Sequence, residues 1–330
     1  MVYTANENRY GSMRYRRCGN SGLKLPEISL GFWYNFGEED RYKTGRKTVL
    51  NAFDAGVTHF DLANNYGPPP GSAETTFGQI LKDCLMPHRD EIVVTTKAGF
   101  EMWPGPYGDW GSRKYLFASL DASLKRMGLD YVDVFYHHRP DPNTPLEETM
   151  TALADIVRQG KALYVGISKY DAQESTRAIS LLRSLGVPCL VHQAKYSMLN
   201  REIEDGLLDV LGKEGVGCVC FSPLAQGLLT DRYLDGSVPK GSRAARGEFL
   251  RPDSITPELL AKLNALNGIA KEGGRTLASL AILWILRDSR NTSVIVGASS
   301  STQLRENLAS LSQPKLSAEE LEKIEKVLRT

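Results

Sequence analysis

The feature that most constrains this chain is a regular alternation of short β-branched runs with longer segments of helical spacing. In the longer segments apolar residues recur at three- and four-residue steps, as at Leu116, Leu120, Leu124 and Met127. Strands that alternate with helices pair in parallel through right-handed crossovers, and eight such units predict a closed (β/α)8 TIM barrel. The eight runs are LPEISLGFW, GVTHFDLA, EIVVTTKAG, YVDVFYHH, ALYVGISKY, VPCLVHQAKY, GVGCVCFSPL and SVIVGASS.

Chain length and a missing motif favour one barrel over other α/β folds. The 330 residues would suffice for two domains, but barrels of this size are routinely single, so we expect one domain over residues 1–330. A doubly wound open sheet usually carries G-x-G-x-x-G after its first strand, and the sequence contains no such motif.

Two further segments are expected to lie at the ends of the barrel. Residues 12–24 alternate before the first barrel strand, which predicts a small hairpin closing the barrel's bottom. Residues 230–256 form a long polar, basic loop after the seventh strand, and loops of that length in compact domains are usually functional or mobile.

Charge and cysteine content narrow the class of partner. The formal charge of +1 argues against nucleic acid or an anionic membrane as the main partner, and favours a small molecule. No apolar run is long enough to span a bilayer, and the first residues lack a signal peptide's apolar core, so we expect a soluble, cytoplasmic protein. The five scattered cysteines are expected to be free, buried thiols.

Ionisable residues fall where three neighbouring strands of the predicted barrel end. Asp61 and Tyr66 follow the second strand, Lys97 ends the third, and His137 or His138 ends the fourth. An ammonium beside a phenol stabilises the phenolate and lowers the phenol's pKa, and a carboxylate can hold that ammonium in place. With a neutral imidazole to orient a carbonyl oxygen, this set suits proton donation coupled to hydride transfer from a cofactor.

Spacing alone leaves the choice of histidine open. Consecutive residues of a strand point to opposite faces, so only one of His137 and His138 enters the site. A metal centre is not expected, because the five histidines show no His-x-x-x-His helix and no Cys/His cluster.

These residues resemble the aldo-keto reductase family of NADPH-dependent (β/α)8 enzymes. The resemblance runs from GLKLPEISLGFW to GASSSTQLRENL, nearly the whole chain. DLANNYGPPPGSAE and TKAGFEMWPGPYG resemble bacterial L-glyceraldehyde 3-phosphate reductases, and YVDVFYHHRPDPNTPLEET resembles β subunits of voltage-gated potassium channels. By this resemblance the catalytic tetrad is Asp61, Tyr66, Lys97 and His138. The channel subunits carry Asn where this chain has His138.

The resemblance also implies an NADPH/NADP site. Ser168 and Gln193 would hold the nicotinamide carboxamide, and Phe221 would stack on the nicotinamide ring. Ser299, Ser300 and Ser301 carry no charge, so Arg243 or Arg305 would have to pair with the 2′-phosphate. A helix start such as GASSS is a good anion site on its own physics. The other implied cofactor residues are Phe32, Trp33, Ser222, Pro223, Leu224, Gln226, Gly227, Arg232, Ser242, Arg243, Gly297, Ser299, Gln303, Glu306 and Asn307.

The expected substrate is a small aldehyde such as a triose phosphate or methylglyoxal, reduced with Tyr66 as proton donor. Trp33 and Tyr34 would face an aromatic pocket wall, and Arg139 would contact a substrate phosphate. The wall after the third strand would consist of Phe100, Trp103, Tyr107 and Trp110. The alternative is an NADP(H)-sensing regulatory subunit with little turnover. The resemblance implies a homo-oligomer, either a tetramer or an octamer.

Overall fold

The computed structural model describes residues 3–37, 42–240, 242–247 and 250–329. Within these ranges, eight parallel strands close into a barrel in the order β10-β3-β4-β5-β6-β7-β8-β9. Each strand lies on one of the eight predicted runs. The strands are β3 Ile28–Gly31, β4 His59–Asp61, β5 Val93–Ala98, β6 Val132–His137, β7 Ala162–Ser168, β8 Cys189–Lys195, β9 Gly217–Phe221 and β10 Asn291–Val296.

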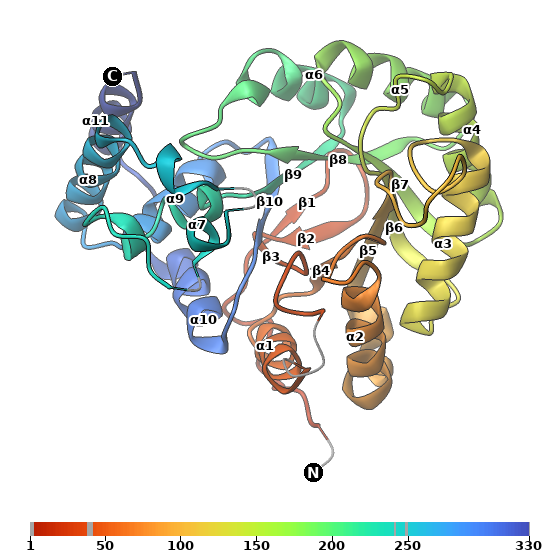
Figure 1. Ribbon diagram of the computed structural model, residues 1–330, viewed down its shortest axis with the longest axis horizontal. Coiled ribbons are helices and arrows are strands. Elements are labelled where there is room, and N and C mark those ends of the chain that lie inside the picture. The colour runs from red at the N-terminus through yellow and green to blue at the C-terminus, as the bar shows by residue number, and fades with distance from the viewer. Residues whose placement is uncertain (1–2, 38–41, 241, 248–249, 330) are drawn as a thin grey trace.

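Helices surround the barrel, as the strand–helix alternation predicts (Figure 1). The arc α3 to α6 covers one side, and α8, α9 and α11 gather on the other. The helices are α1 Tyr42–Asp54, α2 Ser72–Ile80, α3 Arg113–Met127, α4 Leu146–Arg158, α5 Ala172–Ser184, α6 Leu207–Glu214, α7 Arg243–Arg246, α8 Pro257–Glu272, α9 Leu277–Leu286, α10 Ser301–Ala309 and α11 Ala318–Arg329. Among the described residues, no helix is both long and apolar enough to cross a bilayer.

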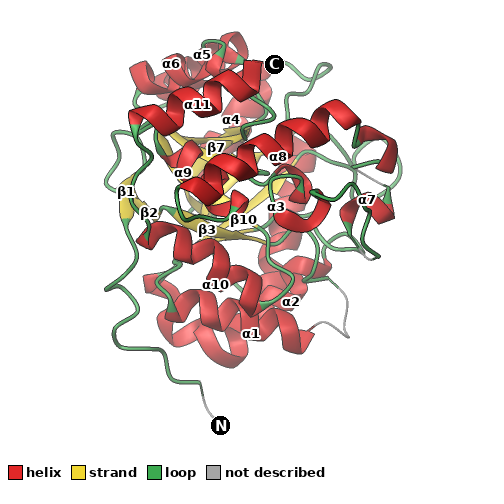
Figure 2. Cartoon of the chain, turned by 90° about the vertical axis from the view of Figure 1, so that its left-hand side faces the viewer, coloured by secondary structure: helices red, strands yellow, loops and turns green. Residues whose placement is uncertain are grey.

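A hairpin closes the bottom of the barrel as predicted, but its second strand begins only at Lys24, the last residue of the predicted range 12–24. Strands β1 Tyr15–Arg17 and β2 Lys24–Pro26 pair antiparallel. Cys18 and Leu25 pack in one buried cluster with Val93 and Val219, which belong to the barrel strands. Figure 2 shows the hairpin at one end of the strands and α7 at the other.

The segment after the seventh strand contains little regular structure, as expected. Between residues 230 and 256 the described part holds α7 and two single-turn helices, Asp231–Tyr233 and Pro252–Ser254. The five cysteines are buried and free, in agreement with the prediction. Cys218 and Cys220 lie on one face of β9 with their sulfur atoms 3.9 Å apart.

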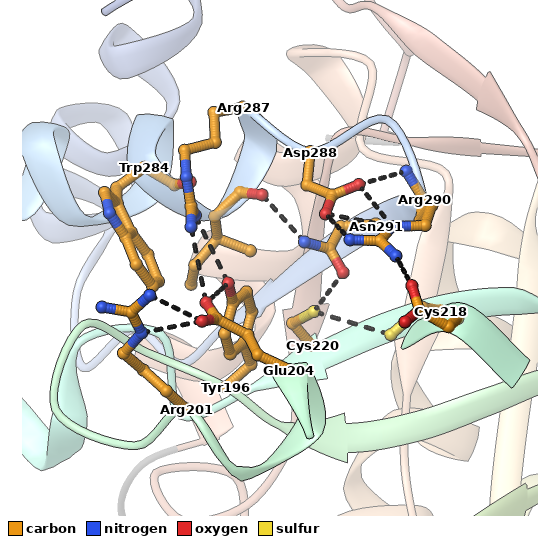
Figure 3. Close-up of polar contacts among 12 residues, drawn as sticks. Tyr196, Arg201, Glu204, Cys218, Cys220, Trp284, Arg287, Asp288, Arg290 and Asn291 are labelled. Atoms are coloured by element: carbon orange, nitrogen blue, oxygen red, sulfur yellow. Dashed lines mark hydrogen bonds and ion pairs between the residues drawn. The ribbon is translucent and has the colours of Figure 1, made fainter. Parts of the chain in front are cut away.

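A partly exposed ionic cluster fixes the end of α9 against the segment that follows β8 (Figure 3). Glu204 accepts hydrogen bonds from Tyr196 and Arg201 and forms an ion pair with Arg287 at 3.4 Å. The Trp284 ring is fully buried, and the Arg287 guanidinium stacks 3.7 Å from its centroid. Burial alone would raise the pKa of Glu204, but hydrogen bonds from Arg201 and Tyr196 outweigh it and lower the pKa.

This cluster predicts a pH-dependent effect of Glu204→Gln on stability. The variant should lose about 1 kcal/mol of unfolding free energy at pH 7, because three donors lose a charged acceptor in a cluster that solvent partly screens. A carboxylate with a lowered pKa stabilises the fold above its unfolded-state pKa, and that stabilisation is lost as the pH falls through the folded-state pKa. The difference from the unmodified protein should therefore shrink below pH 4.5, the ordinary glutamate value.

Urea unfolding followed by circular dichroism at pH 7 and at acidic pH measures the difference. Glu319→Gln serves as the control, because that side chain is 78% exposed and pairs only with Lys323 in the described structure. A Glu204→Gln effect no larger than the control's at pH 7 would contradict the stabilising role of the cluster.

Candidate active site

A cavity of about 670 Å³ opens at the C-terminal end of the barrel strands. Parallel strands bring their carboxyl ends to one rim, so residues far apart in sequence meet there. The sequence-predicted site residues that line the cavity are Trp33, Tyr34, Asp61, Tyr66, His138, Gln193, Phe221, Ser222, Pro223, Leu224, Gln226, Gly227, Arg232, Gly297 and Gln303.

The structure resolves the choice between the two histidines. His138 lines the cavity, and its ring lies 5.9 Å from that of Tyr66. His137 points to the other face of β6, where its Nδ1 lies 2.6 Å from the Tyr170 hydroxyl. Burial, together with Lys97 and Lys169, lowers the pKa of His138 well below its usual value, so the imidazole is neutral at physiological pH.

Lys97 connects the acid and the phenol of the predicted tetrad. Its ammonium donates to Asp61 Oδ2 at 2.7 Å, to the Leu62 carbonyl at 2.5 Å and to the Tyr66 hydroxyl at 3.3 Å. An ammonium has three protons, so these bonds use all of them. The Tyr66 oxygen is therefore an acceptor from Lys97, and its own proton is free to point to another acceptor.

One expectation about this pair is wrong. Lys97 was expected to lower the pKa of Tyr66. In the structure, burial, followed by the nearby Asp61 carboxylate, raises the pKa of Tyr66 well above its ordinary value. The Asp61 carboxylate accepts from Lys97 at 2.7 Å, so the ion pair offers little net positive charge to the buried hydroxyl. Tyr66 is thus protonated at neutral pH.

A chain of buried polar contacts runs from Asp61 down through the barrel interior. Thr95 donates to Asp61 Oδ1 at 2.8 Å, and the Thr95 hydroxyl lies 3.3 Å from His59 Nε2. His59 Nδ1 lies 2.8 Å from Ser29 Oγ, which lies 2.6 Å from Ser293 Oγ. The Ser293 hydroxyl donates to the Pro26 carbonyl at 2.6 Å. Burial lowers the pKa of His59 to about 4, so it is neutral as well.

Ser168 and Gln193 lie beside the cavity on inward-facing strand positions. The Ser168 hydroxyl is buried and has no hydrogen-bond partner among the described residues. Gln193 Nε2 donates to Asp61 Oδ1 at 2.8 Å. An unsatisfied buried hydroxyl at the edge of a cavity is costly, and a polar ligand group would remove that cost. These residues fit a bound carboxamide.

Two predicted aromatic contacts lie outside the cavity wall. Phe32 is fully buried and packs against Phe36 and Phe77, with ring centroids 4.2 and 5.1 Å apart. It follows Gly31 and precedes Trp33, both of which face the cavity, so strand alternation turns Phe32 toward the helices. Trp103 packs against Tyr115 of α3 at 5.4 Å. The expected cofactor contact of Phe32 and substrate contact of Trp103 are therefore not supported.

The remaining predicted cofactor residues lie around the cavity rather than in its wall. Ser242 caps α7 by accepting from the Ala245 amide, and the side chain of Arg243 lies outside the described residues. In the loop before α10, the amide and hydroxyl of Ser299 both donate to Gln303. Farther along α10, Glu306 is exposed and Asn307 is buried.

Arg139 is held away from the cavity. Its guanidinium donates to both carboxylate oxygens of Asp109 at 2.9 and 3.0 Å and to the Gly99 carbonyl at 2.6 Å. The same group stacks 3.7 Å from the Trp110 ring centroid. Because its main donors are already used inside the protein, the structure does not support Arg139 as a phosphate contact.

Sequence reasoning missed several residues of the cavity wall. Lys169 and Lys195 line it but were not predicted as site residues, whereas Phe100 lines it as the aromatic segment after the third strand predicted. Lys169 directly follows Ser168 and takes a left-handed backbone conformation, φ 64°, which no pattern of apolar alternation reveals. The sequence feature that could have identified Lys169 is its position one residue beyond the end of a strand, where barrel sites form.

The chain is similar over almost its whole length to known proteins. Residues 27–329 match the model of the Aldo/keto reductase family. The chain is 53% identical to the L-glyceraldehyde 3-phosphate reductase of Escherichia coli (strain K12), over 98% of this chain and 95% of that protein. It is 38% identical to a probable voltage-gated potassium channel subunit beta of Oryza sativa subsp. japonica, over 96% of this chain and 97% of that protein. The chain therefore belongs to the aldo/keto reductase family.

Proposed function

We propose that this chain reduces small aldehydes to alcohols with a nicotinamide cofactor, preferentially NADPH. The observation that carries the proposal is the buried Lys97 ammonium, whose three donors meet Asp61, the Leu62 carbonyl and Tyr66 at the wall of a large cavity. This arrangement supplies a proton to a carbonyl oxygen, and none of its groups is a nucleophile aimed at an acyl carbon.

In this proposal Tyr66 gives the proton. Its raised pKa keeps the hydroxyl protonated before reaction, and Lys97 lies 3.3 Å from the oxygen that becomes negative when the proton leaves. Asp61 keeps the ammonium charged and oriented. His138, neutral and open to the cavity, donates a hydrogen bond to the carbonyl oxygen and orients it toward Tyr66.

The cofactor would lie between the strand ends and the loops after β9 and β10. Ser168 and Gln193 would bind its carboxamide, and Phe221 would cover its ring. Residues 222–227 and Arg232 would contact the pyrophosphate, and the start of α10 would bind the adenosine end. A bound nicotinamide cofactor would supply the hydride for the reduction.

The proposed substrates are L-glyceraldehyde 3-phosphate and short aldehydes such as methylglyoxal. Support comes from the name of the Escherichia coli relative, at 53% identity. Trp33 and Tyr34 give the cavity an aromatic wall next to Tyr66, since the Trp33 ring lies 4.9 Å from the Tyr66 ring. Such a wall suits a small, partly apolar substrate.

A second candidate is an NADP(H)-sensing regulatory subunit with little turnover. It draws support from the 38% identity to the rice relative, whose name describes a probable channel subunit. His138 argues against this candidate, because its neutral imidazole faces the cavity where a carbonyl would bind. Steady NADPH oxidation with glyceraldehyde 3-phosphate supports the reductase, and cofactor binding without turnover on any aldehyde supports the sensor.

Replacing Tyr66 tests the proton donor. We expect Tyr66→Phe to lower kcat for glyceraldehyde 3-phosphate by about 10²- to 10⁴-fold, since general acid catalysis contributes that much. Cofactor affinity, measured by quenching of tryptophan fluorescence, should hardly change. Tyr107→Phe is the matched control, because Tyr107 is 56% exposed and does not line the cavity. Full turnover by Tyr66→Phe would exclude Tyr66 as the donor.

Two arginine variants test cofactor selectivity. Arg305 lies on α10 near the proposed adenosine end, so Arg305→Ala should weaken NADPH binding about tenfold and leave NADH binding unchanged. Arg232 lines the cavity beside residues 222–227, so Arg232→Ala should weaken both cofactors equally. Titration of each variant with NADPH and NADH gives the two ratios. Equal losses in Arg305→Ala would show that another residue recognises the 2′-phosphate.

A further inference from the structure

The cavity wall carries more positive than negative charge. Lys169, Lys195 and Arg232 line it, and the acid among its described lining residues is Asp61, which is paired with Lys97. The proposed pyrophosphate contact accounts for Arg232. A cation near the proposed carbonyl position needs another explanation.

Lys169 enters the cavity because the backbone turns sharply at the end of β7. Its φ of 64° lies in the left-handed region, which is unfavourable for a residue with a side chain. The Lys169 amide donates to the Gln193 carbonyl at 3.2 Å, which ties the turn to the neighbouring strand β8. This tie holds the lysine on the cavity side after Ser168, instead of letting strand alternation carry it outward.

The Lys169 ammonium lies at the reacting end of the cavity. Its Nζ is 4.5 Å from the Phe100 ring centroid and 5.9 Å from the Phe221 ring centroid. The Phe100 ring stands edge-on to His138, with centroids 4.7 Å apart. One aromatic ring therefore separates the ammonium from the imidazole proposed to orient the carbonyl.

No carboxylate compensates this charge within the described residues. The charged groups that act on Lys169 are Lys97, Arg139 and Lys195, of which Lys97 is paired with Asp61 and Arg139 with Asp109; His138 nearby is neutral. Burial in the cavity wall, followed by these three cations, lowers the pKa of Lys169 to about 8. The side chain is still open to the cavity. An uncompensated cation facing a ligand cavity is a natural partner for a ligand anion.

We propose that Lys169 binds the anionic group of the substrate and selects phosphorylated short-chain aldehydes over uncharged ones. This inference rests on the proposed reductase function and names the substrate class of the same site. In a three-carbon aldehyde phosphate the phosphorus lies four bonds from the carbonyl carbon, so both ends fit within one cavity of this size. Phe100 and Phe221 flank the ammonium, so a phosphate paired with it would lie beside two aromatic rings.

The test compares kcat/KM for glyceraldehyde 3-phosphate with kcat/KM for glyceraldehyde, using NADPH. We expect Lys169→Met to lower this ratio about 10- to 100-fold, because a charge-assisted hydrogen bond to the substrate phosphate is lost. The change should appear as a higher KM for glyceraldehyde 3-phosphate. Turnover of glyceraldehyde and the affinity for NADPH should stay within about twofold. Lys169→Arg should retain most of the ratio because it keeps the charge.

The pH dependence of the same ratio gives a second readout. Lys169 loses its charge as the pH rises through about 8, so the ratio should fall above that pH in the unmodified protein. The ratio should stay flat in Lys169→Arg, since a guanidinium keeps its charge in this range. Tyr66 and His138 act on both substrates, so their titration changes both kcat/KM values equally and leaves the ratio unchanged.

Lys195→Met is the matched comparison, because Lys195 lines the same cavity at the end of β8. A larger fall of the ratio in Lys195→Met than in Lys169→Met would overturn the assignment. So would an unchanged ratio in Lys169→Met, or a parallel loss of NADPH affinity, which would make Lys169 a cofactor residue. Failure of the proposed function itself is recognised separately, as absence of turnover on either aldehyde in the unmodified protein.

Discussion

The ion pair between Lys97 and Asp61 is the interaction on which the rest of the site depends. Both side chains lie inside the barrel, with exposed fractions of 0% and 2%, where an unpaired charge would be very costly. Their 2.7 Å contact requires the register in which Asp61 of β4 lies opposite Thr95 of β5, two residues before Lys97. Closure of the barrel therefore sets the geometry of the pair, and the pair in turn places Tyr66 at the cavity wall.

Much of the fold and the centre of the site could be predicted from the sequence. Strand–helix alternation is a repeating physical signal, and it predicted all eight barrel strands. The hairpin beneath them was predicted from the residue-by-residue alternation of residues 12–24. The residues of the proposed tetrad could be placed at one rim because three of them lie at or next to strand ends, where parallel strands converge. The choice of His138 over His137 needed either the family resemblance or the structure. The alternation of side chains along a strand shows that the two point to opposite faces, but not which of them faces the barrel interior.

The failures have physical reasons of their own. Arg139 follows His138 directly, yet Asp109 from a distant loop neutralises it, and no local pattern reveals such a partner. Lys169 was missed because a single left-handed residue breaks the alternation on which strand reasoning depends. The sign of the Tyr66 pKa shift was missed because it depends on burial and on the distance to Asp61, which the sequence does not contain.

In the polar chain beneath Asp61, the donor and acceptor of each hydrogen bond can be assigned from the number of hydrogens that each group carries. Each hydroxyl has one proton, and that of Ser293 goes to the Pro26 carbonyl, so Ser29 must donate to Ser293. His59 must then donate from Nδ1 to Ser29, which leaves its Nε2 without a hydrogen in the neutral ring. Thr95 gives its proton to Asp61, so no hydrogen remains between Thr95 and Nε2, and that 3.3 Å contact is the longest of the chain. The backbone carbonyl of a proline at the barrel floor thus selects the tautomer of a histidine two contacts below the proposed catalytic acid–base centre.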